Sequence, residues 1–153
     1  MSEADISIRR ATELDQPAIR ALARTGQLNR TDVKWSSCWV ATAAGQQIVG
    51  IVQMRRHSDG SHELGPLVVR KEMRGQGVAK RLMDALVAAE PGPVWMVTAH
   101  VFTAVCKRWG FRPIEAPSAP VEVRRNQRMS SLARVFRMRQ PTRPLIILER
   151  LPA

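Results

Sequence analysis

The stretch "VVRKEMRGQGVAKRLMDALV" at residues 68–87 places two glycines between an apolar run and a segment with helical spacing. The apolar run ends a predicted strand, and the segment at 77–90 is a predicted helix. At Gly75 and Gly77 the main chain can take a positive φ and approach a ligand closely, while the first N–H groups of the helix point outward. The pattern therefore predicts an anion-binding turn that suits a phosphate or a pyrophosphate.

Two common nucleotide motifs fit this turn poorly. A dinucleotide-binding fingerprint requires a third small residue where Lys80 stands, and it follows the first strand of a βαβ series. A P-loop requires Gly-Lys followed by Ser or Thr, and the chain contains no such tripeptide. A structural turn that simply needs glycine is the remaining alternative to a ligand site.

Outward from the turn, the hydrophobic pattern predicts a mixed α/β (α+β) fold. The apolar runs before the turn are separated by short polar breaks and predict an antiparallel meander at 38–43, 47–56 and 62–69. A strand and a helix precede this meander at 6–11 and 13–25. The later predicted elements are a strand at 94–99, a helix at 101–109 that ends at Gly110, a short strand from Phe111, and a last strand at 144–151. The segment 26–37 shows no clear period.

Length and composition indicate one domain, residues 1–153, in a reducing cytoplasm. A chain of 153 residues can bury a sizeable core, and its two cysteines, Cys38 and Cys106, are too few for a disulfide framework. No secretory leader, membrane span or metal-ligand spacing is predicted. We therefore expect neither a membrane partner nor a metal.

Basic residues outnumber acidic ones, 24 to 13, giving a net charge of +11. The excess is concentrated in 121–143, which holds seven arginines and one acid, inside a helical insert predicted at about 116–143. A solvated helix face is one interpretation of this segment, and a surface for nucleic acid or another polyanion is the other.

The glycine turn resembles the acetyl-CoA signature of the GNAT acetyltransferase superfamily, Arg/Gln-x-x-Gly-x-Gly/Ala, through Arg74, Gly77 and Ala79. A second similarity is "CKRWGF" at 106–111, which occupies the place of the family's Tyr-x-x-x-Gly-Phe. The resemblance covers about residues 6–115. It implies a mostly antiparallel mixed sheet of about six to seven strands, with splayed fourth and fifth strands and about four to five flanking helices. It also implies acetyl-CoA as cosubstrate and N-acetyl transfer as activity.

The resemblance assigns the cofactor to two stretches. Gly65-Pro66 interrupts the predicted strand where the family has a bulge, and main-chain groups beyond it would pair with the pantetheine arm. The amides of the turn would bind the pyrophosphate. The predicted cofactor-binding residues are Leu67, Val68, Val69, Arg74, Gly75, Gln76, Gly77, Val78, Ala79 and Lys80.

Acetyl transfer to an amine by direct attack requires a base. Glu63 lies six residues before Val69, at the position where some family members have a catalytic glutamate. His62 and Glu63 point to opposite faces of a regular strand, so we expect only one of them to face the site. Glu63 is the predicted base, acting directly or through water, and an exposed strand-end carboxylate is the alternative. His57 is expected to be a solvated strand end.

The predicted acid departs from the family pattern. The chain has no tyrosine, and Cys106 stands where the family often has one. A thiol, with an ordinary pKa of about 8.5 against about 10 for tyrosine, can protonate a departing thiolate. A buried, inert cysteine is the alternative, and His100 is a rival donor.

Two functions follow from these residues. The first is a cytoplasmic N-acetyltransferase that acts on a primary amine of a small molecule, an amino acid or a protein. The arginines favour an acceptor with a carboxylate over a polyamine, because like charges repel. The second is a catalytically weak GNAT-like module that binds acyl-CoA and docks on nucleic acid or an acidic protein through its arginines. The sequence leaves open the acceptor, the acyl chain length and whether two chains form a homodimer.

Overall fold

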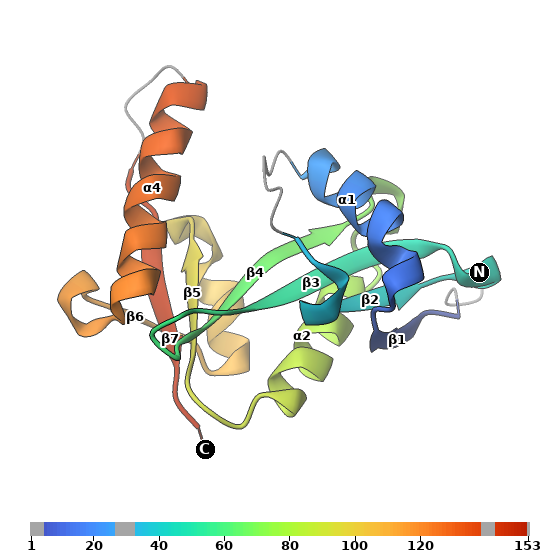
Figure 1. The fold of residues 1–153 in the computed structure, drawn as a ribbon, viewed down its shortest axis with the longest axis horizontal. Helices are drawn as coiled ribbons and strands as arrows, with labels where there is room; N and C mark the ends of the chain where they lie inside the picture. Colours follow the sequence, from blue (N-terminus) through green and yellow to red (C-terminus); the bar gives the residue numbers. More distant parts are fainter. Residues whose placement is uncertain (1–4, 27–32, 139–142, 153) are drawn as a thin grey trace. The chain divides into compact units, whose positions relative to one another are not determined.

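The computed structural model describes residues 5–26, 33–138 and 143–152. Segment 27–32, within the stretch that shows no period, and Arg139 of the basic insert lie outside the described residues. In the described parts, seven strands form one mixed sheet in the order β1-β2-β3-β4-β5-β7-β6 (Figure 1). The mixed α/β fold predicted from the sequence is confirmed.

The elements lie close to the predicted ranges. The strands are β1 (Ser7–Arg10), β2 (Cys38–Thr42), β3 (Ile48–Arg56), β4 (His62–Val69), β5 (Val94–Thr98), β6 (Arg112–Ile114) and β7 (Ile146–Arg150). The α-helices are α1 (Gln16–Thr25), α2 (Val78–Ala89), α3 (Thr103–Cys106) and α4 (Val121–Met138). The helix predicted at 101–109 is a short α3 between two 3₁₀ turns, and it ends at Gly110 with φ of 82°.

Contacts between residues divide the chain into two compact units. Unit 1 comprises Met1–Met54 and Gly65–Ala89, and unit 2 comprises Arg55–Leu64 and Glu90–Ala153. Unit 1 therefore holds the glycine turn with α2, and unit 2 holds Glu63 and Cys106.

In unit 1, β2 pairs with both β1 and β3 in antiparallel register. Val40 lies opposite Ile51, and both side chains belong to the core cluster that includes Ile19 and Leu22 of α1. Successive residues of a strand point to opposite faces, so Gly50 belongs to the other face of the sheet. The face with Val40 and Ile51 is thus the one that α1 covers (Figure 1).

Helix α2 covers the other face of unit 1, and Gly50 sets how close it comes. A Cβ atom added at Gly50 would lie 3.0 Å from both Leu82 Cδ1 and Val78 Cγ1 of α2. Both of those side chains are buried. A larger residue at position 50 would therefore displace α2, and with it the turn from which this helix begins.

In unit 2, β5 pairs with β7 in antiparallel register and with β4 in parallel register. Trp95 and Val97 of β5 pack in a cluster with Val123 of α4. The intervening Met96 has its sulfur 3.7 Å from the thiol of Cys106 in α3. Because alternate residues face opposite ways, α4 and α3 cover opposite faces of β5.

The parallel pairs between β4 and β5 are Glu63 with Trp95 and Leu64 with Met96. Gly65 follows directly with a φ of 137°, a backbone conformation that favours glycine. The predicted interruption at Gly65-Pro66 thus comes immediately after the paired residues, and Glu63 lies within the paired part of the strand.

An ion pair connects β1 to the turn before α1. The Arg9 guanidinium donates to both carboxylate oxygens of Asp15, at 2.7 and 3.0 Å, and the Thr12 N–H donates to the same carboxylate at 2.7 Å. The hydrogen bond from Arg9 lowers the pKa of Asp15 to about 2. The ionised carboxylate is therefore favoured in the folded state.

We expect Asp15→Asn to destabilise the protein at neutral pH. Because the folded pKa of Asp15 lies below the unfolded value, its contribution is fully present above about pH 4 and is lost as pH falls toward 2. The difference in unfolding free energy between the two proteins should fall to about half by pH 3. Urea unfolding from pH 7 to pH 3 measures this difference, with the exposed Asp5→Asn as control. A difference that does not change with pH would contradict the assignment.

Candidate active site

The glycine turn of unit 1 has the backbone that the sequence predicts. Gly75 and Gly77 have φ of 78° and 76°, and a side chain at either position would be strained. The N–H of Arg81 donates to Gly77 O at 3.0 Å, so the helical hydrogen bonds start at the second glycine. The preceding N–H groups of the first turn have no partner within the helix. They form the positive end of α2, which suits an anion.

The side chains around this turn are partly engaged by the protein itself. Arg74 Nε donates to Val69 O at 3.2 Å, and Gln76 Nε2 donates to Glu72 O at 3.2 Å. Lys80 Nζ lies 2.6 Å from Asp84 in an exposed pair. The main chain is thus the part of the turn that is shaped for an anion, and the basic side chains add charge around it.

The other predicted cofactor residues surround the turn. Val68 and Val69 are buried at the end of β4, whereas Leu67 is exposed. Val78 is buried against the sheet at the start of α2. A ligand at this strand end therefore meets backbone groups and the side chain of Leu67, because the valines point into the core.

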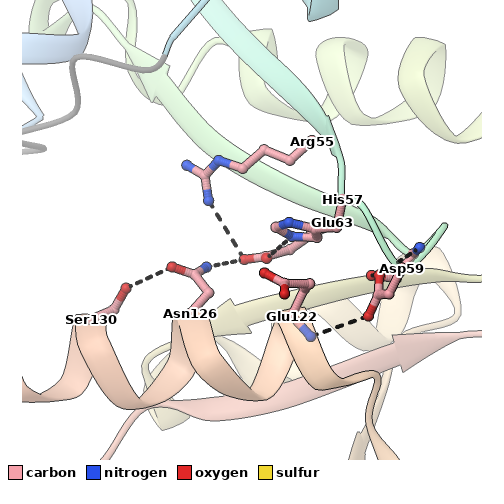
Figure 2. Close-up of polar contacts among 8 residues, drawn as sticks. Arg55, His57, Asp59, Glu63, Glu122, Asn126 and Ser130 are labelled. Carbon is pink, nitrogen blue, oxygen red and sulfur yellow. Dashed lines mark hydrogen bonds and ion pairs between the residues drawn. The ribbon is translucent and has the colours of Figure 1, made fainter.

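Glu63 in unit 2 is the centre of a buried polar network (Figure 2). Only 1% of its side chain is exposed. Its Oε2 accepts a hydrogen bond from His57 Nε2 at 2.7 Å, and its Oε1 accepts one from the Asn126 side-chain amide. Arg55 lies 3.6 Å from Oε1. A buried carboxylate is stable only with such partners, so these residues fix Glu63 in one orientation.

Three elements supply the partners of Glu63. Arg55 lies at the end of β3, His57 lies in the turn that follows, and Asn126 lies on α4 (Figure 2). Ser130, one turn further along α4, donates to Asn126 Oδ1 at 3.1 Å and fixes the amide so that its NH₂ faces the carboxylate. The network is thus built from a hairpin and a helix that are far apart in sequence.

The turn of the hairpin also binds the start of α4. Asp59 accepts from the N–H and the hydroxyl of Ser61 at 3.0 and 2.6 Å, and from the N–H of Glu122 at 3.2 Å. The hydrogen bonds from Ser61 lower the pKa of Asp59. A carboxylate at a helix N-terminus satisfies an N–H that the helix itself leaves unpaired.

The expectation that His57 is a solvated strand end is wrong. Only 17% of its side chain is exposed, and it is hydrogen-bonded to Glu63. Its main-chain N–H donates to Ser61 O at 2.9 Å, which closes the turn and carries the ring back toward Glu63. The available sequence signal was that His57 comes two residues after Arg55, a spacing that puts both on the same face of an extended strand. No comparable signal in the sequence indicated that Asn126 contributes to the network.

His62 and Glu63 have different surroundings, as expected for neighbours on a strand. His62 Nδ1 lies 3.0 Å from Glu90 Oε2, and Arg56 donates to Glu90 Oε1 at 2.8 Å. His62 therefore belongs to a separate polar cluster that does not include Glu63.

Cys106 is buried in α3, and burial raises the pKa of its thiol. It therefore remains protonated near neutral pH. His100, the rival donor, is exposed in the 3₁₀ turn before α3. Burial also raises the pKa of Cys38, to about 12.

The arginine-rich insert forms α4, which contacts the rest of unit 2 through the buried Val123 and through polar side chains. Gln127 donates to Leu145 O at 2.7 Å, and the Leu145 N–H donates to Ser131 at 3.1 Å. Large apolar side chains face solvent on the same helix, namely Val121, Met129, Leu132, Val135 and Phe136. Between residues 121 and 136, the exposed side chains thus include these apolar residues together with Arg125 and Arg128. None of the described helices combines the length and the apolar character that crossing a bilayer requires.

Comparison with known proteins agrees with the fold. Residues 34–113 match the family model described as the acetyltransferase (GNAT) domain, which is more than half of the chain. The protein belongs to the GNAT acetyltransferase family. No curated protein matches the chain.

Solved structures of low sequence identity share the fold. N-acetylglutamate synthase from Neisseria gonorrhoeae, bound to coenzyme A and N-acetyl-glutamate, is 20% identical with a TM-score of 0.76 and covers 98% of this chain. The chain spans only 36% of that enzyme's length. A Mycobacterium tuberculosis protein in complex with CoA is 20% identical with a TM-score of 0.68, and the match covers 96% of this chain and 99% of that one. A Staphylococcus aureus GNAT acetyltransferase is 17% identical with a TM-score of 0.62, covering 95% and 98%.

We expect both cysteines to react slowly with iodoacetamide in the folded protein. The thiolate is the reactive form, and burial raises both pKa values. At pH 8, Cys38 should be alkylated on the order of a thousandfold more slowly than free glutathione, and Cys106 also more slowly than glutathione. Mass spectrometry of peptides after timed labelling measures both rates, with denatured protein as control. Labelling of Cys106 as fast as glutathione would show that it is an activated nucleophile.

Proposed function

We propose that the protein transfers the acetyl group of acetyl-CoA to a primary amine. The observation that carries this proposal is the turn before α2, in which both glycines have positive φ and the first amides of the helix precede the first helical hydrogen bond. This arrangement suits the pyrophosphate of coenzyme A. Membership of the GNAT family and the CoA complexes of the proteins with the same fold support the choice of cosubstrate.

The proposed reaction is direct attack. The neutral amine nitrogen forms a bond with the thioester carbonyl carbon, the carbon–sulfur bond breaks, and the amine loses one proton while the coenzyme A thiolate gains one. The network around Glu63 is the proposed destination of the amine proton. Cys106 is the proposed donor to the thiolate, since it stands where the family often has a tyrosine and its thiol carries a proton near neutral pH.

An amino acid with a carboxylate is the acceptor class to test first. The net charge of +11 favours an anionic acceptor over a polyamine. The N. gonorrhoeae enzyme with the same fold was crystallised with N-acetyl-glutamate, an acetylated acidic amino acid. Its identity of 20% gives the fold alone, so the acceptor is part of the proposal.

The alternative of a nucleic-acid-binding module has less support. Its proposed surface is α4, whose exposed face carries Met129, Leu132 and Phe136 beside the arginines. Phosphate groups gain nothing from such apolar side chains. A salt titration separates the two functions, because a surface that contacts several phosphates loses affinity steeply as salt rises.

Gly77→Ala should weaken the binding of coenzyme A about tenfold. A side chain at φ of 76° is strained, and relaxing that strain moves the amides of the turn. No atom lies within 4 Å of the added Cβ, so the fold should be retained. Isothermal titration calorimetry with coenzyme A measures the effect.

The matched control is Gly45→Ala. Gly45 has φ of 71° and equally open space around its added Cβ, but it lies in the turn between β2 and β3. This variant carries the same backbone strain at another place in unit 1. Equal affinities for coenzyme A in the two variants would remove the glycine turn from the cosubstrate site.

The activity itself is tested by release of thiol from acetyl-CoA in the presence of single amines. We expect turnover with glutamate or aspartate and little with spermidine at equal concentration, with the acetylated amine identified by mass spectrometry. Thiol release that is independent of any amine would indicate hydrolysis and would contradict the proposal.

A further inference from the structure

The buried position of Glu63 is difficult to reconcile with direct proton transfer from an amine. Both carboxylate oxygens already accept hydrogen bonds, Oε2 from His57 and Oε1 from Asn126. An amine or a water that binds this carboxylate must displace one of these donors from a side chain that is 1% exposed. A buried charge that loses a donor is strongly destabilised, so the displaced state is unfavourable.

The side chain of His57 is more exposed to solvent than that of Glu63. Its side chain is 17% exposed, against 1% for Glu63. A carboxylate only accepts hydrogen bonds, so Nε2 carries the hydrogen in the 2.7 Å bond to Glu63. In the neutral ring, Nδ1 then holds the lone pair. In the described residues, Glu63 is the one side chain that is hydrogen-bonded to this ring.

We propose that His57 accepts the proton that the attacking amine loses, and that Glu63 is the residue that positions the imidazole. This inference rests on the proposed acetyl transfer. The amine nitrogen bonds to the carbonyl carbon as one of its protons passes to Nδ1 of His57. The imidazolium then lies against the Glu63 carboxylate, and its proton leaves to solvent after the carbon–sulfur bond has broken.

The surrounding charges fit this division of roles. Glu63 on β4 stabilises a positive ring, and Asp59 in the hairpin turn adds a second negative charge near His57. Arg55 on β3 lies 3.6 Å from Glu63 Oε1, and the amide of Asn126 donates to the same oxygen. On α4, Glu122 is the nearby acid, and its N–H binds Asp59. The carboxylate can therefore orient His57 without taking the proton itself.

The first test compares kcat and KM of His57→Gln with those of the wild-type protein. The glutamine amide can donate to Glu63 in place of Nε2, so the buried carboxylate keeps a partner, but it has no titratable nitrogen. We expect kcat to fall about a hundredfold at pH 7 while the affinity for coenzyme A, measured by calorimetry, is unchanged. His62→Gln, the same substitution in the separate cluster with Glu90, should remain within about twofold of wild type.

Two further readouts separate a catalytic from a structural role. Added imidazole should restore part of the activity that His57→Ala has lost. It should leave the activity of His62→Ala unchanged. Glu63→Gln should lower kcat about tenfold with little change in KM, because the glutamine oxygen still accepts from the ring but carries no charge opposite the imidazolium. A merely structural Glu63 would change kcat and KM together.

The outcomes are distinguishable. If the wild-type protein is active and His57→Gln has the same rate and pH profile, the role of His57 is overturned. The proposed acetyl transfer is then unaffected. Absence of amine-dependent thiol release in the wild-type protein would overturn both proposals.

Discussion

The structure of unit 2 depends on the hydrogen bonds that the buried carboxylate of Glu63 accepts. Removing a charge from water costs roughly several kcal/mol of free energy unless hydrogen bonds replace the lost hydration. Here the replacement comes from His57, Asn126 and the nearby Arg55, which lie on the hairpin and on α4. Two of these partners are held by a further contact, Asn126 by Ser130 and the main chain of His57 by Ser61. The charge thereby selects one arrangement of hairpin and helix, and the same arrangement holds an imidazole at the border between the core and solvent.

The candidate site in unit 1 differs from the network in unit 2 because it consists of main-chain groups. The direction of α2 decides where the amides of the turn point, and α2 is placed by its packing on the sheet. The absence of a side chain at Gly50 lets Val78 and Leu82 come close to β3. Glycines thus have two separate roles around α2. Gly50 allows the helix to pack closely on the sheet, and the glycines of the turn leave the first helical amides accessible. A small residue in a strand thereby helps to position the candidate site.

The sequence predicted the order of the elements well, because apolar periodicity and glycine or proline breaks are local signals. It also predicted the conformation at Gly75 and Gly77, since a turn between a strand and a helix limits the choice. It did not predict the environment of His57, because the hydrogen bond to Glu63 depends on how the hairpin closes. Nor did it predict that α4 contacts the protein through polar side chains as well as through Val123. Periodicity arguments assume that the apolar side of a helix is the buried one, whereas Asn126, Gln127 and Ser131 are used as hydrogen-bonding groups toward the protein.

The bond between Glu63 and Asn126 makes the arginine-rich insert a structural part of the protein. The two residues are 63 positions apart, yet the loss of either leaves the other buried without a hydrogen-bonding group that it requires. In related chains, the residues at these two positions should therefore be inherited together. A relative whose last two strands are joined by a short loop instead of α4 is expected to have lost the negative charge at the position of Glu63, or to supply a substitute amide from elsewhere.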